Sequence, residues 1–226
     1  MRQIVLDTET TGLSFQQGHR IVEIGCVELK NYIPTGSTYQ VYINPERSMD
    51  PSAIQVSGIT DDFLQDKQKF KDVVGDFCEF IKDSPLVIHN ARFDLGFING
   101  EFGLLNRAPL DFSRAIDTVK MARAKFPGSP ANLDALCRRF EIDISGREKH
   151  GALLDAHLLA EVYLQLIGGR QFGLTLDKKI NDNNQVIDLK SLPLRESRNF
   201  KASDEEIEKH KAFIESFKTP LWKKFA

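Results

Sequence analysis

The amino-acid sequence predicts an α/β fold over residues 1–168, followed by an extension of different composition. Two observations carry this prediction. Short runs of β-branched and aromatic residues crowd the first 43 positions, and the spacing of apolar residues then changes from strand-like to helical. The chain has 226 residues, of which 41% are hydrophobic and 27% charged, so it can bury a core of ordinary size. We therefore expect one compact domain and a modest extension.

The first elements are expected to be strands. A short apolar run ends at Asp7 and predicts a central strand over residues 4–6. Residues 20–30 and 37–43 are rich in β-branched and aromatic side chains, and residues 31–36, which include a proline and a glycine, predict the turn between them. Three strands so close together in sequence predict an antiparallel meander.

Helices and short strands are expected to alternate in the remainder of the domain. Apolar residues at positions 70, 73, 74, 77 and 81 form the stripe of an amphipathic helix. Strands are expected at residues 86–88 and 115–118. Further helices are expected over about residues 92–105, 131–140 and 151–167, the last of them stopped by two glycines.

Composition excludes several classes of protein. Lysine and arginine number 30 against 32 acidic residues, so the net charge of −2 does not indicate a nucleic-acid partner, which must be argued from a local site. No apolar run approaches the roughly 18 residues of a membrane span, and the N-terminus lacks the apolar stretch of a secretory signal, which predicts a cytoplasmic protein. The cysteines, at positions 26, 78 and 137, are far apart and odd in number, so we expect neither a disulfide framework nor a structural zinc site.

Four carboxylates stand out by their positions. Asp7 and Glu9 are two residues apart at the end of a strand and so share one face, although for so short a motif taken alone a solvated strand end is the commoner reading. Asp94 and Asp155 share the apolar sides of their helices, where a carboxylate is costly unless it is compensated. Each alone could be satisfied by backbone N–H groups at a helix N-terminus. All four together favour a pair of divalent cations, Mg²⁺ or Mn²⁺.

One histidine is a candidate general base. His150 precedes Asp155 by five residues, which would place the two about 140° apart on a continuous helix. If the helix begins after His150, the imidazole lies on a loop at the rim of the same site, where it could accept a proton from water. An exposed loop histidine without a function is the alternative. No comparable placement is expected for the other histidines, His19, His89, His157 and His210.

Three segments resemble the exonuclease motifs of the DEDD superfamily, histidine branch. They are DTETTGL at residues 7–13, IHNARFD at 88–94 and HGALLDA at 150–156. Each is weak alone, but the three in this order and spacing are specific. The segments GHRIVEIG at 18–25, LDALC at 133–137 and LAEVYL at 159–164 extend the match. The chain resembles the proofreading exonuclease subunits of bacterial replicative DNA polymerases, closely over residues 1–176 and loosely in the last 25 or so.

The resemblance implies an RNase H-like exonuclease fold, with a mixed five-stranded sheet flanked by helices and a flexible C-terminal extension. It implies that Asp7, Glu9, Asp94 and Asp155 hold two metal ions and that His150 deprotonates the attacking water. The backbone at Thr11 and Gly12, with the Leu13 side chain, would hold the terminal nucleotide, and Asn90 and Phe93 would flank the strand. The full set of implied substrate contacts is Asp7, Glu9, Thr11, Gly12, Leu13, Ser52, Ser57, Asn90, Phe93 and Asp155.

Two of these positions depart from the pattern of the family. Ser57 occupies a place where a histidine often contacts the substrate, and Ser52 a place that is often acidic. These departures affect the details of substrate contact and leave the chemistry unchanged.

The function implied is that of a 3′→5′ DNA exonuclease that proofreads for the replicative polymerase. It would hydrolyse the terminal phosphodiester of a frayed, single-stranded 3′ end and release 5′-mononucleotides. A free-standing RNA or single-stranded DNA 3′ exonuclease on the same fold is an alternative, although it would not need an extension after residue 169. A catalytically inactive adaptor is a third reading, and the complete set of acidic residues and His150 argues against it.

The extension divides into three expected parts after an exonuclease domain at residues 1–170. Residues 171–176, QFGLTL, resemble a sliding-clamp-binding motif, or are simply the chain leaving its last helix. Residues 177–202 are expected to be a polar linker. Residues 203–226 begin with an S-x-x-E capping box and carry an apolar stripe up to Pro220. We expect this tail to bind the alpha subunit of the polymerase, the alternative being that it docks on the nuclease domain.

Overall fold

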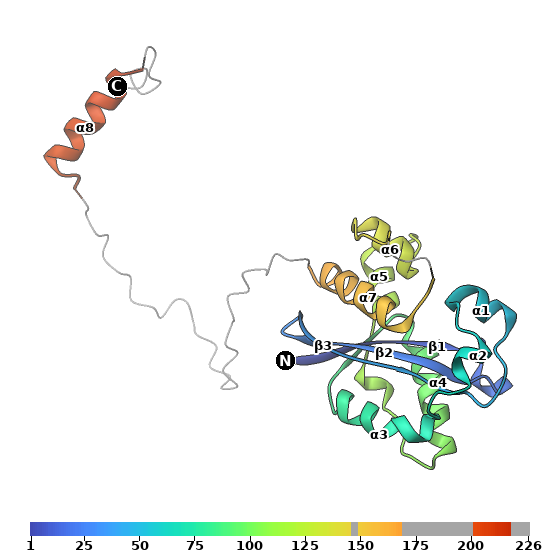
Figure 1. Ribbon diagram of the computed structural model, residues 1–226. Coiled ribbons are helices and arrows are strands. Elements are labelled where there is room, and N and C mark those ends of the chain that lie inside the picture. The colour runs from blue at the N-terminus through green and yellow to red at the C-terminus, as the bar shows by residue number, and fades with distance from the viewer. Residues whose placement is uncertain (146–148, 169–200, 218–226) are drawn as a thin grey trace. The chain divides into compact units, whose positions relative to one another are not determined.

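A five-stranded mixed sheet organises the N-terminal part of the chain (Figure 1). The strand order is β3-β2-β1-β4-β5. Strands β1 (Arg2–Thr10), β2 (Ile21–Lys30) and β3 (Ile33–Tyr42) pair antiparallel in sequence order, and β4 (Leu86–Ile88) and β5 (Ala115–Asp117) extend the sheet parallel to β1. The predicted meander and the mixed five-stranded sheet are both confirmed.

The computed structural model describes residues 1–145, 149–168 and 201–217. The chain forms two units, Met1–Thr175 and Leu176–Ala226. The expected clamp-binding segment at residues 171–176, nearly all of the expected linker and the end of the tail, with Pro220, lie outside the described residues.

The turn between β2 and β3 is shorter than the sequence predicts. Asn31 and Tyr32 both have positive φ angles, 52° and 69°, and β3 begins at the next residue. Two central residues with positive φ suit the right-handed twist of a hairpin. The expectation of a turn through residue 36 is therefore wrong. The proline that suggested it lies within an edge strand, where a missing N–H group is tolerated.

Two helices cover one face of the sheet. They are α3 (Phe70–Ile81) and α4 (Ala91–Leu104), and the core on this side includes Ile4 and Leu6 of β1 (Figure 1). The alternate residue Val5 belongs to the core on the opposite face. This alternation along β1 has a direct consequence for the site, because residues 7 and 9 share the face of Val5.

Three helices cover the other face. They are α5 (Thr118–Lys125), α6 (Leu133–Arg139) and α7 (Ala152–Leu166). Helix α7 packs directly against β1 and β2. The sequence predicted α6 and α7 to within about two residues at each end, but it did not predict α5.

Short helices complete the N-terminal unit. Helices α1 (Pro51–Ser57) and α2 (Asp61–Leu64) follow β3, and two 3-10 turns lie at Phe15–Gln17 and Phe112–Arg114. The sequence predicted none of them. In the part of the chain that the structure describes, the three cysteines form no disulfide, and no helix has the length and apolar character to cross a membrane.

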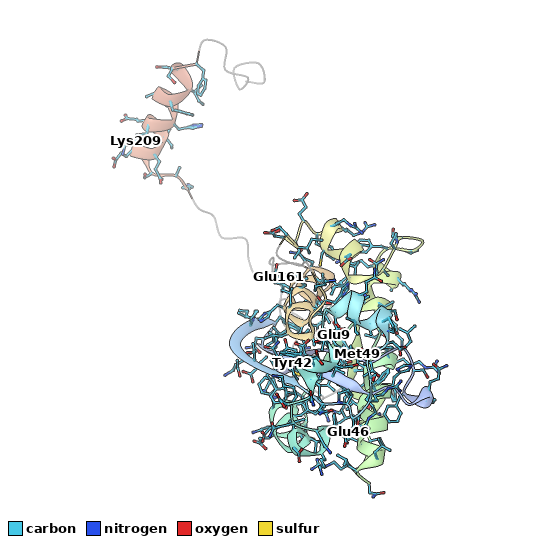
Figure 2. The ribbon with its side chains drawn as sticks, turned by 45° about the vertical axis from the view of Figure 1, so that its right-hand side comes forward. Glu9, Tyr42, Glu46, Met49, Glu161 and Lys209 are labelled. Atoms are coloured by element: carbon cyan, nitrogen blue, oxygen red, sulfur yellow. The ribbon has the colours of Figure 1, made fainter. Side chains whose placement is uncertain are left out.

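The C-terminal unit contains one described helix, α8 (Asp204–Glu215). Ser203 and Glu206 form the predicted capping box, with the Ser203 hydroxyl accepting from the N–H of residue 206. On its surface the ammonium of Lys209, which Figure 2 labels, forms an ion pair of 2.7 Å with Glu205. The helix ends at Glu215, two residues before the end of the described tail.

Candidate active site

Four carboxylates converge at the end of β1. Asp7 and Glu9 lie on the last residues of this central strand, on the face that α7 covers. Asp155 lies in the first turn of α7, and Asp94 in the first turn of α4. Asp94 and Asp155 are only 3% and 4% exposed. The sheet thus gathers residues that are up to 148 positions apart in sequence, as the pattern predicted.

Asp7 is the electrostatic centre of this cluster. Burial raises its pKa well above the usual value, and the neighbouring charges of Asp94, Asp155, Glu9 and Glu23 raise it further. Like charges held this close disfavour one another's ionisation unless a cation neutralises them. Carboxylate oxygens are the ligands that hard divalent cations prefer, so the donor set fits such ions. Ligand atoms of Glu9, His150 and Asp155 lie within 4.8 Å of one another, close enough to share one ion.

Asp94 is set apart from the other carboxylates by its surroundings. Thr8, on the opposite face of β1 from Asp7, donates its hydroxyl to Asp94 Oδ1 at 2.8 Å. Burial raises the pKa of Asp94 to about 7, although this hydrogen bond opposes the shift. In the absence of metal, a substantial fraction of Asp94 is therefore protonated near neutral pH.

His150 lies on the loop before α7, as the sequence predicted. Its side chain is 44% exposed, and Nδ1 lies 3.1 Å from Oδ2 of Asp155. Its backbone N–H donates to the carbonyl of Val56 at 3.1 Å, and the ammonium of Lys149 donates to the carbonyl of Gln55 at 2.8 Å. Helix α1 therefore holds this loop at the rim of the site.

A cavity of about 240 Å³ opens onto these groups. Its lining includes Asp7, His150, Asp155, Asn132 and, unexpectedly, His89. The expectation that His89 has no comparable placement is wrong. Its Nδ1 lies 2.9 Å from the hydroxyl of Thr118, and burial lowers its pKa, so the ring is neutral at neutral pH. Its position directly after β4, at the same edge of the sheet as Asp7, was the signal that could have identified it.

The loop after β1 is held by internal hydrogen bonds. Thr11 donates its N–H to the carbonyl of Arg20 at 2.9 Å and accepts from the N–H of Asp50 at 3.0 Å. A Cβ at residue 12 would lie 2.4 Å from the ring of His19, so a larger residue there would displace that ring. Leu13, in contrast, is 85% exposed. The loop therefore presents one apolar side chain to solvent on a constrained backbone.

The remaining expected substrate contacts differ in their accessibility. Ser57 is buried, and its hydroxyl donates to the carbonyl of Ala53 at 2.9 Å and accepts from the N–H of Ile59 at 3.2 Å. Ser52 is exposed in the first turn of α1. Asn90 is exposed with a φ of 69°, directly before α4, and Phe93 packs against a neighbouring ring. In this structure the hydroxyl of Ser57 therefore has a structural role, because both of its hydrogen bonds stabilise the C-terminal end of α1.

Sequence reasoning missed one buried acid at the site. Glu23 on β2 pairs in register with Glu9. One of its carboxylate oxygens accepts from the backbone N–H of Ala152 at 3.0 Å, and the other accepts from the side-chain amide of Gln40 at 2.8 Å. Glu23 therefore ties the first residue of α7 to the sheet, three residues before Asp155. Its place in the strand pattern, among apolar residues at positions 21, 22 and 24, was the only signal for it.

Comparison with known sequences identifies relatives over nearly the whole chain. A profile of the family described as Exonuclease matches residues 4–163. A DNA polymerase III subunit epsilon from Rickettsia felis is 51% identical over 221 residues, covering 96% of this chain and 96% of that protein. The protein of the same name from Escherichia coli K12 is 44% identical over 224 residues, covering 95% of this chain and 92% of that one.

Solved structures share the fold of the N-terminal unit. The nuclease domain of 3′hExo, a DEDDh family member bound to rAMP, has a TM-score of 0.63 at 21% identity, covering 74% of this chain and 91% of that one. A zinc-bound form of an E. coli ExoI–ssDNA complex has a TM-score of 0.64 at 18% identity, covering 75% and 41%. These likenesses confirm the exonuclease fold, and one of them is of a protein that binds a divalent metal.

Proposed function

This chain belongs to the exonuclease family and, within it, to the epsilon subunits of DNA polymerase III, and on that premise we propose how its residues act. The chain is a 3′→5′ DNA exonuclease that proofreads for the replicative polymerase. The observation that carries the proposed mechanism is the convergence of four carboxylates and one rim histidine at the end of β1.

The carboxylates form the ion-binding half of the site. We assign Asp7, Glu9, Asp94 and Asp155 as the ligands of two divalent cations, Mg²⁺ or Mn²⁺. When bound, such ions neutralise the carboxylates and stabilise the charge that develops on the phosphate during an in-line displacement. The raised pKa of Asp7 supports this assignment, because a cluster of ionised acids needs a compensating positive charge.

His150 serves as the general base. In the proposed arrangement the Asp155 carboxylate accepts from the N–H at Nδ1 of His150, which leaves Nε2 as the nitrogen whose lone pair takes a proton. The attacking water loses a proton to this nitrogen while its oxygen bonds to phosphorus. The bond between phosphorus and the 3′-oxygen of the preceding nucleotide breaks, and that oxygen takes up a proton. The products are a 5′-mononucleotide and a strand shortened by one residue.

The loop around Leu13 supports a preference for an unpaired end. We propose that the terminal nucleotide lies against this exposed side chain and the constrained backbone of Thr11 and Gly12. A terminus that is mispaired costs less free energy to unpair than a matched one, so it enters the site more often. The preference for mispaired termini then follows from the lower cost of unpairing them, and the enzyme does not need to recognise the base itself.

The partners of this chain are proposed from the family. We propose that residues 203–226 bind the alpha subunit of the polymerase, that residues 171–176 bind the sliding clamp, and that the complex works in the cytoplasm. The predicted capping box and the exposed Phe213 and Phe217 support an amphipathic helix whose apolar side chains are left exposed among the described residues 201–217.

Replacement of Asp7 tests the mechanism. Asp7→Asn should abolish Mg²⁺-dependent shortening of a 5′-labelled primer, whereas the exposed surface variant Asp83→Asn should retain it. The unaltered chain should shorten a primer with a mispaired terminus faster than a matched one, and the difference should vanish on single-stranded DNA. Retained activity in Asp7→Asn would overturn the assignment of the site. Equal shortening of RNA and DNA would favour the free-standing RNA exonuclease.

A further inference from the structure

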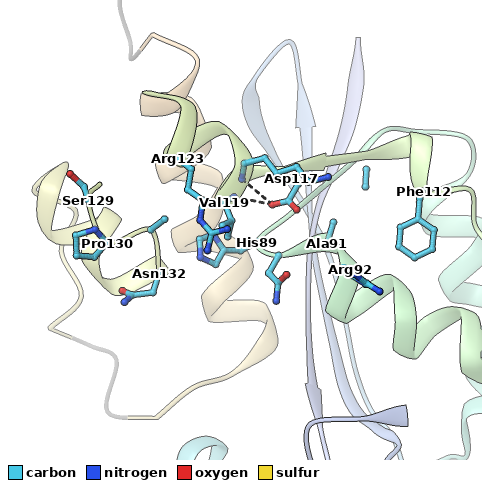
Figure 3. A pocket seen from close by; sticks show the side chains of 14 residues that line it. His89, Ala91, Arg92, Phe112, Asp117, Val119, Arg123, Ser129, Pro130 and Asn132 are labelled. Carbon is cyan, nitrogen blue, oxygen red and sulfur yellow. Dashed lines mark hydrogen bonds between the residues drawn. The ribbon is translucent and has the colours of Figure 1, made fainter. Parts of the chain in front are cut away.

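A second and larger pocket adjoins the catalytic cavity. It encloses about 1090 Å³ and shares His89 and Asn132 with the smaller cavity (Figure 3). Its walls come from the first turn of α4, from β5 with α5, and from the loop before α6. Small-molecule sites typically enclose about 300–1,000 Å³, so this pocket has room for an extended ligand.

Three cationic side chains line this pocket, Arg92 on α4 and Lys120 and Arg123 on α5. Figure 3 shows Arg123 reaching from α5 into the pocket, with Arg92 and Phe112 toward its other end. Among the described residues, no carboxylate lies within ion-pair distance of these three side chains. We call this feature the cationic pocket.

The acidic residue in the lining of the cationic pocket, Asp117, already accepts hydrogen bonds from the protein backbone. Asp117 accepts from the backbone N–H groups of Val119 at 2.9 Å and Lys120 at 3.3 Å, and so caps α5. His89 is neutral because burial lowers its pKa. The pocket therefore carries a local excess of positive charge on a chain whose net charge is −2, which favours a polyanionic ligand.

An exposed aromatic ring completes the lining. Phe112 is 51% exposed beside the three cations. Single-stranded nucleic acids are typically bound by cations that follow the backbone and by aromatic rings on which bases stack, without reading of sequence. The combination suits a short segment of such a strand better than it suits an apolar ligand.

We propose that the cationic pocket holds the substrate strand on the 5′ side of the bond that is cut. The direction rests on the proposed function, which places the terminal nucleotide at the Thr11–Leu13 loop. That loop is hydrogen-bonded to the start of α1, and α1 packs beside β2. The cationic pocket lies beyond β1 in the opposite direction, at the ends of β4 and β5. A strand whose terminus occupies the loop therefore continues across the cleavage site into this pocket.

Kinetics on two substrates, one with a 5′ strand and one without, can distinguish a failure of this proposal from a failure of the proposed function. The variant Arg92→Ala/Lys120→Ala/Arg123→Ala is compared, as the full chain, with Lys30→Ala/Lys71→Ala/Arg138→Ala, which removes the same charge from exposed positions elsewhere. On a ten-nucleotide single strand, the pocket variant should have a KM raised by about tenfold or more at physiological salt. On thymidine 5′-(p-nitrophenyl phosphate), in which an aryl group replaces the 5′ strand, its kcat/KM should match that of the control.

Equal losses on both substrates would overturn the proposal and would give these cations a role at the cleavage site itself. Equal losses in the pocket and control variants would overturn it in favour of a general effect of net charge. If the unaltered chain hydrolyses neither substrate, the proposed function fails, and that result does not depend on the pocket variant.

A binding measurement without chemistry provides an independent test. In EDTA, the affinity for a fluorescent ten-nucleotide strand is measured by anisotropy across salt concentrations. Each phosphate contact of a single strand contributes about 0.7 to the slope of log K against log salt, so the pocket variant should lose about 2 from that slope. Binding of thymidine 5′-monophosphate should be unchanged. Loss of mononucleotide binding with an unchanged slope would overturn the proposal and identify a site for the released product.

Discussion

At the scale of single residues, the site brings together several acidic side chains that repel one another when they are ionised. Asp7 lies among Glu9, Asp94 and Asp155, with Glu23 close behind, and its pKa is raised well above the usual value. Without metal, this arrangement lowers the stability of the folded state once the acids ionise. The free energy of unfolding of the metal-free protein should therefore depend on pH and on ion binding.

Asp94 allows this dependence to be measured. Its pKa is about 7 in the folded chain against an ordinary value of 3.8, so between these values the folded state holds a proton that the unfolded state has lost. The free energy of unfolding must then fall as the pH rises through this window. Asp94→Asn, whose amide oxygen can still accept from Thr8, should remove this loss. In EDTA, we expect its melting temperature to exceed that of the unaltered chain by several degrees at pH 7.5, and the two to converge near pH 4.

The control for this measurement is a surface acid. Asp83→Asn, at an exposed position, should follow the pH dependence of the unaltered chain. A melting temperature of Asp94→Asn that stays below that of the unaltered chain at pH 7.5 would contradict the raised pKa.

The role of His150 is separable from that of the carboxylates. His150→Ala should lower kcat by about 10²–10⁴-fold, because a general base contributes that much, while the affinity for Mn²⁺ changes little. His150→Gln should do no better, because an amide cannot take the proton. The matched control is His157→Ala, an exposed histidine on α7. Calorimetric titration with Mn²⁺ decides the matter, since a large loss of affinity in His150→Ala would make His150 a ligand.

The four carboxylates could be predicted from the sequence because a charged residue that interrupts or directly follows an apolar pattern is visible at a single position. Asp94 and Asp155 interrupt apolar helix faces, and Asp7 and Glu9 follow a buried strand, so their convergence could be expected. His89 and Glu23 leave no comparable trace. His89 lies at the site because it directly follows a strand. Glu23 lies there because its side chain accepts a hydrogen bond from the backbone of Ala152, 129 residues further along the chain.

At the scale of elements, the seating of α7 on β2 fixes the position of Asp155. A Cβ at Gly25 would lie 2.2 Å from the backbone of Ala152 and Leu153, so the start of the helix approaches the strand without any side chain between them. Glu23, two residues earlier on the same strand, accepts from the N–H of Ala152. The strand thus acts as a platform for the catalytic end of the helix.

Gly25→Ala should therefore impair both activity and stability. The added methyl group meets backbone atoms, which cannot move aside without shifting α7 and, with it, Asp155. Gly75→Ala is a matched control, because a Cβ there, within α3, meets nothing within 4 Å, and alanine in a helix is favoured over glycine by about 0.5–1 kcal/mol. Thermal melting and primer shortening should fall in the first variant and stay level or improve in the second. An active, stable Gly25→Ala would show that α7 can be repositioned freely.

Three of the short helices, α1, α2 and α5, were not predicted from the sequence, although α6, with 7 residues, was. Helices α1, α2 and α5 have 7, 4 and 8 residues, too few for a clear apolar period. They depend on local devices, such as the Thr60 and Asp117 side chains that accept from N–H groups at the starts of α2 and α5. Such caps are visible in a sequence only when the helix that follows is long enough to be expected.

At the scale of the whole molecule, the chain consists of two units with different expected tasks. The site and both pockets belong to Met1–Thr175, and α8 belongs to the unit that follows. The nuclease unit supplies every proposed catalytic residue by itself. Activity and attachment to the polymerase should therefore be separable.

Removal of residues 181–226 tests this separation. The shortened chain should degrade single-stranded DNA as fast as the full chain, because no proposed catalytic residue is lost, and it should fail to co-elute with the alpha subunit. The full-length variant Leu174→Ala/Leu176→Ala should still co-elute, because it alters only the expected clamp-binding segment. Co-elution of the shortened chain in size-exclusion chromatography would contradict the assignment of the tail.

The shared direction of β1, β4 and β5 has a consequence for how such an enzyme can diversify. These parallel strands end at one edge of the sheet, where Asp7 and the starts of α4 and α5 contribute to the lining of the two pockets. The apolar core lies behind that edge and is built from other residues. Mutations that alter the lining therefore leave the core packing largely intact. In evolutionary terms, stability and substrate choice are inherited on different parts of the chain, so selection can change one without sacrificing the other.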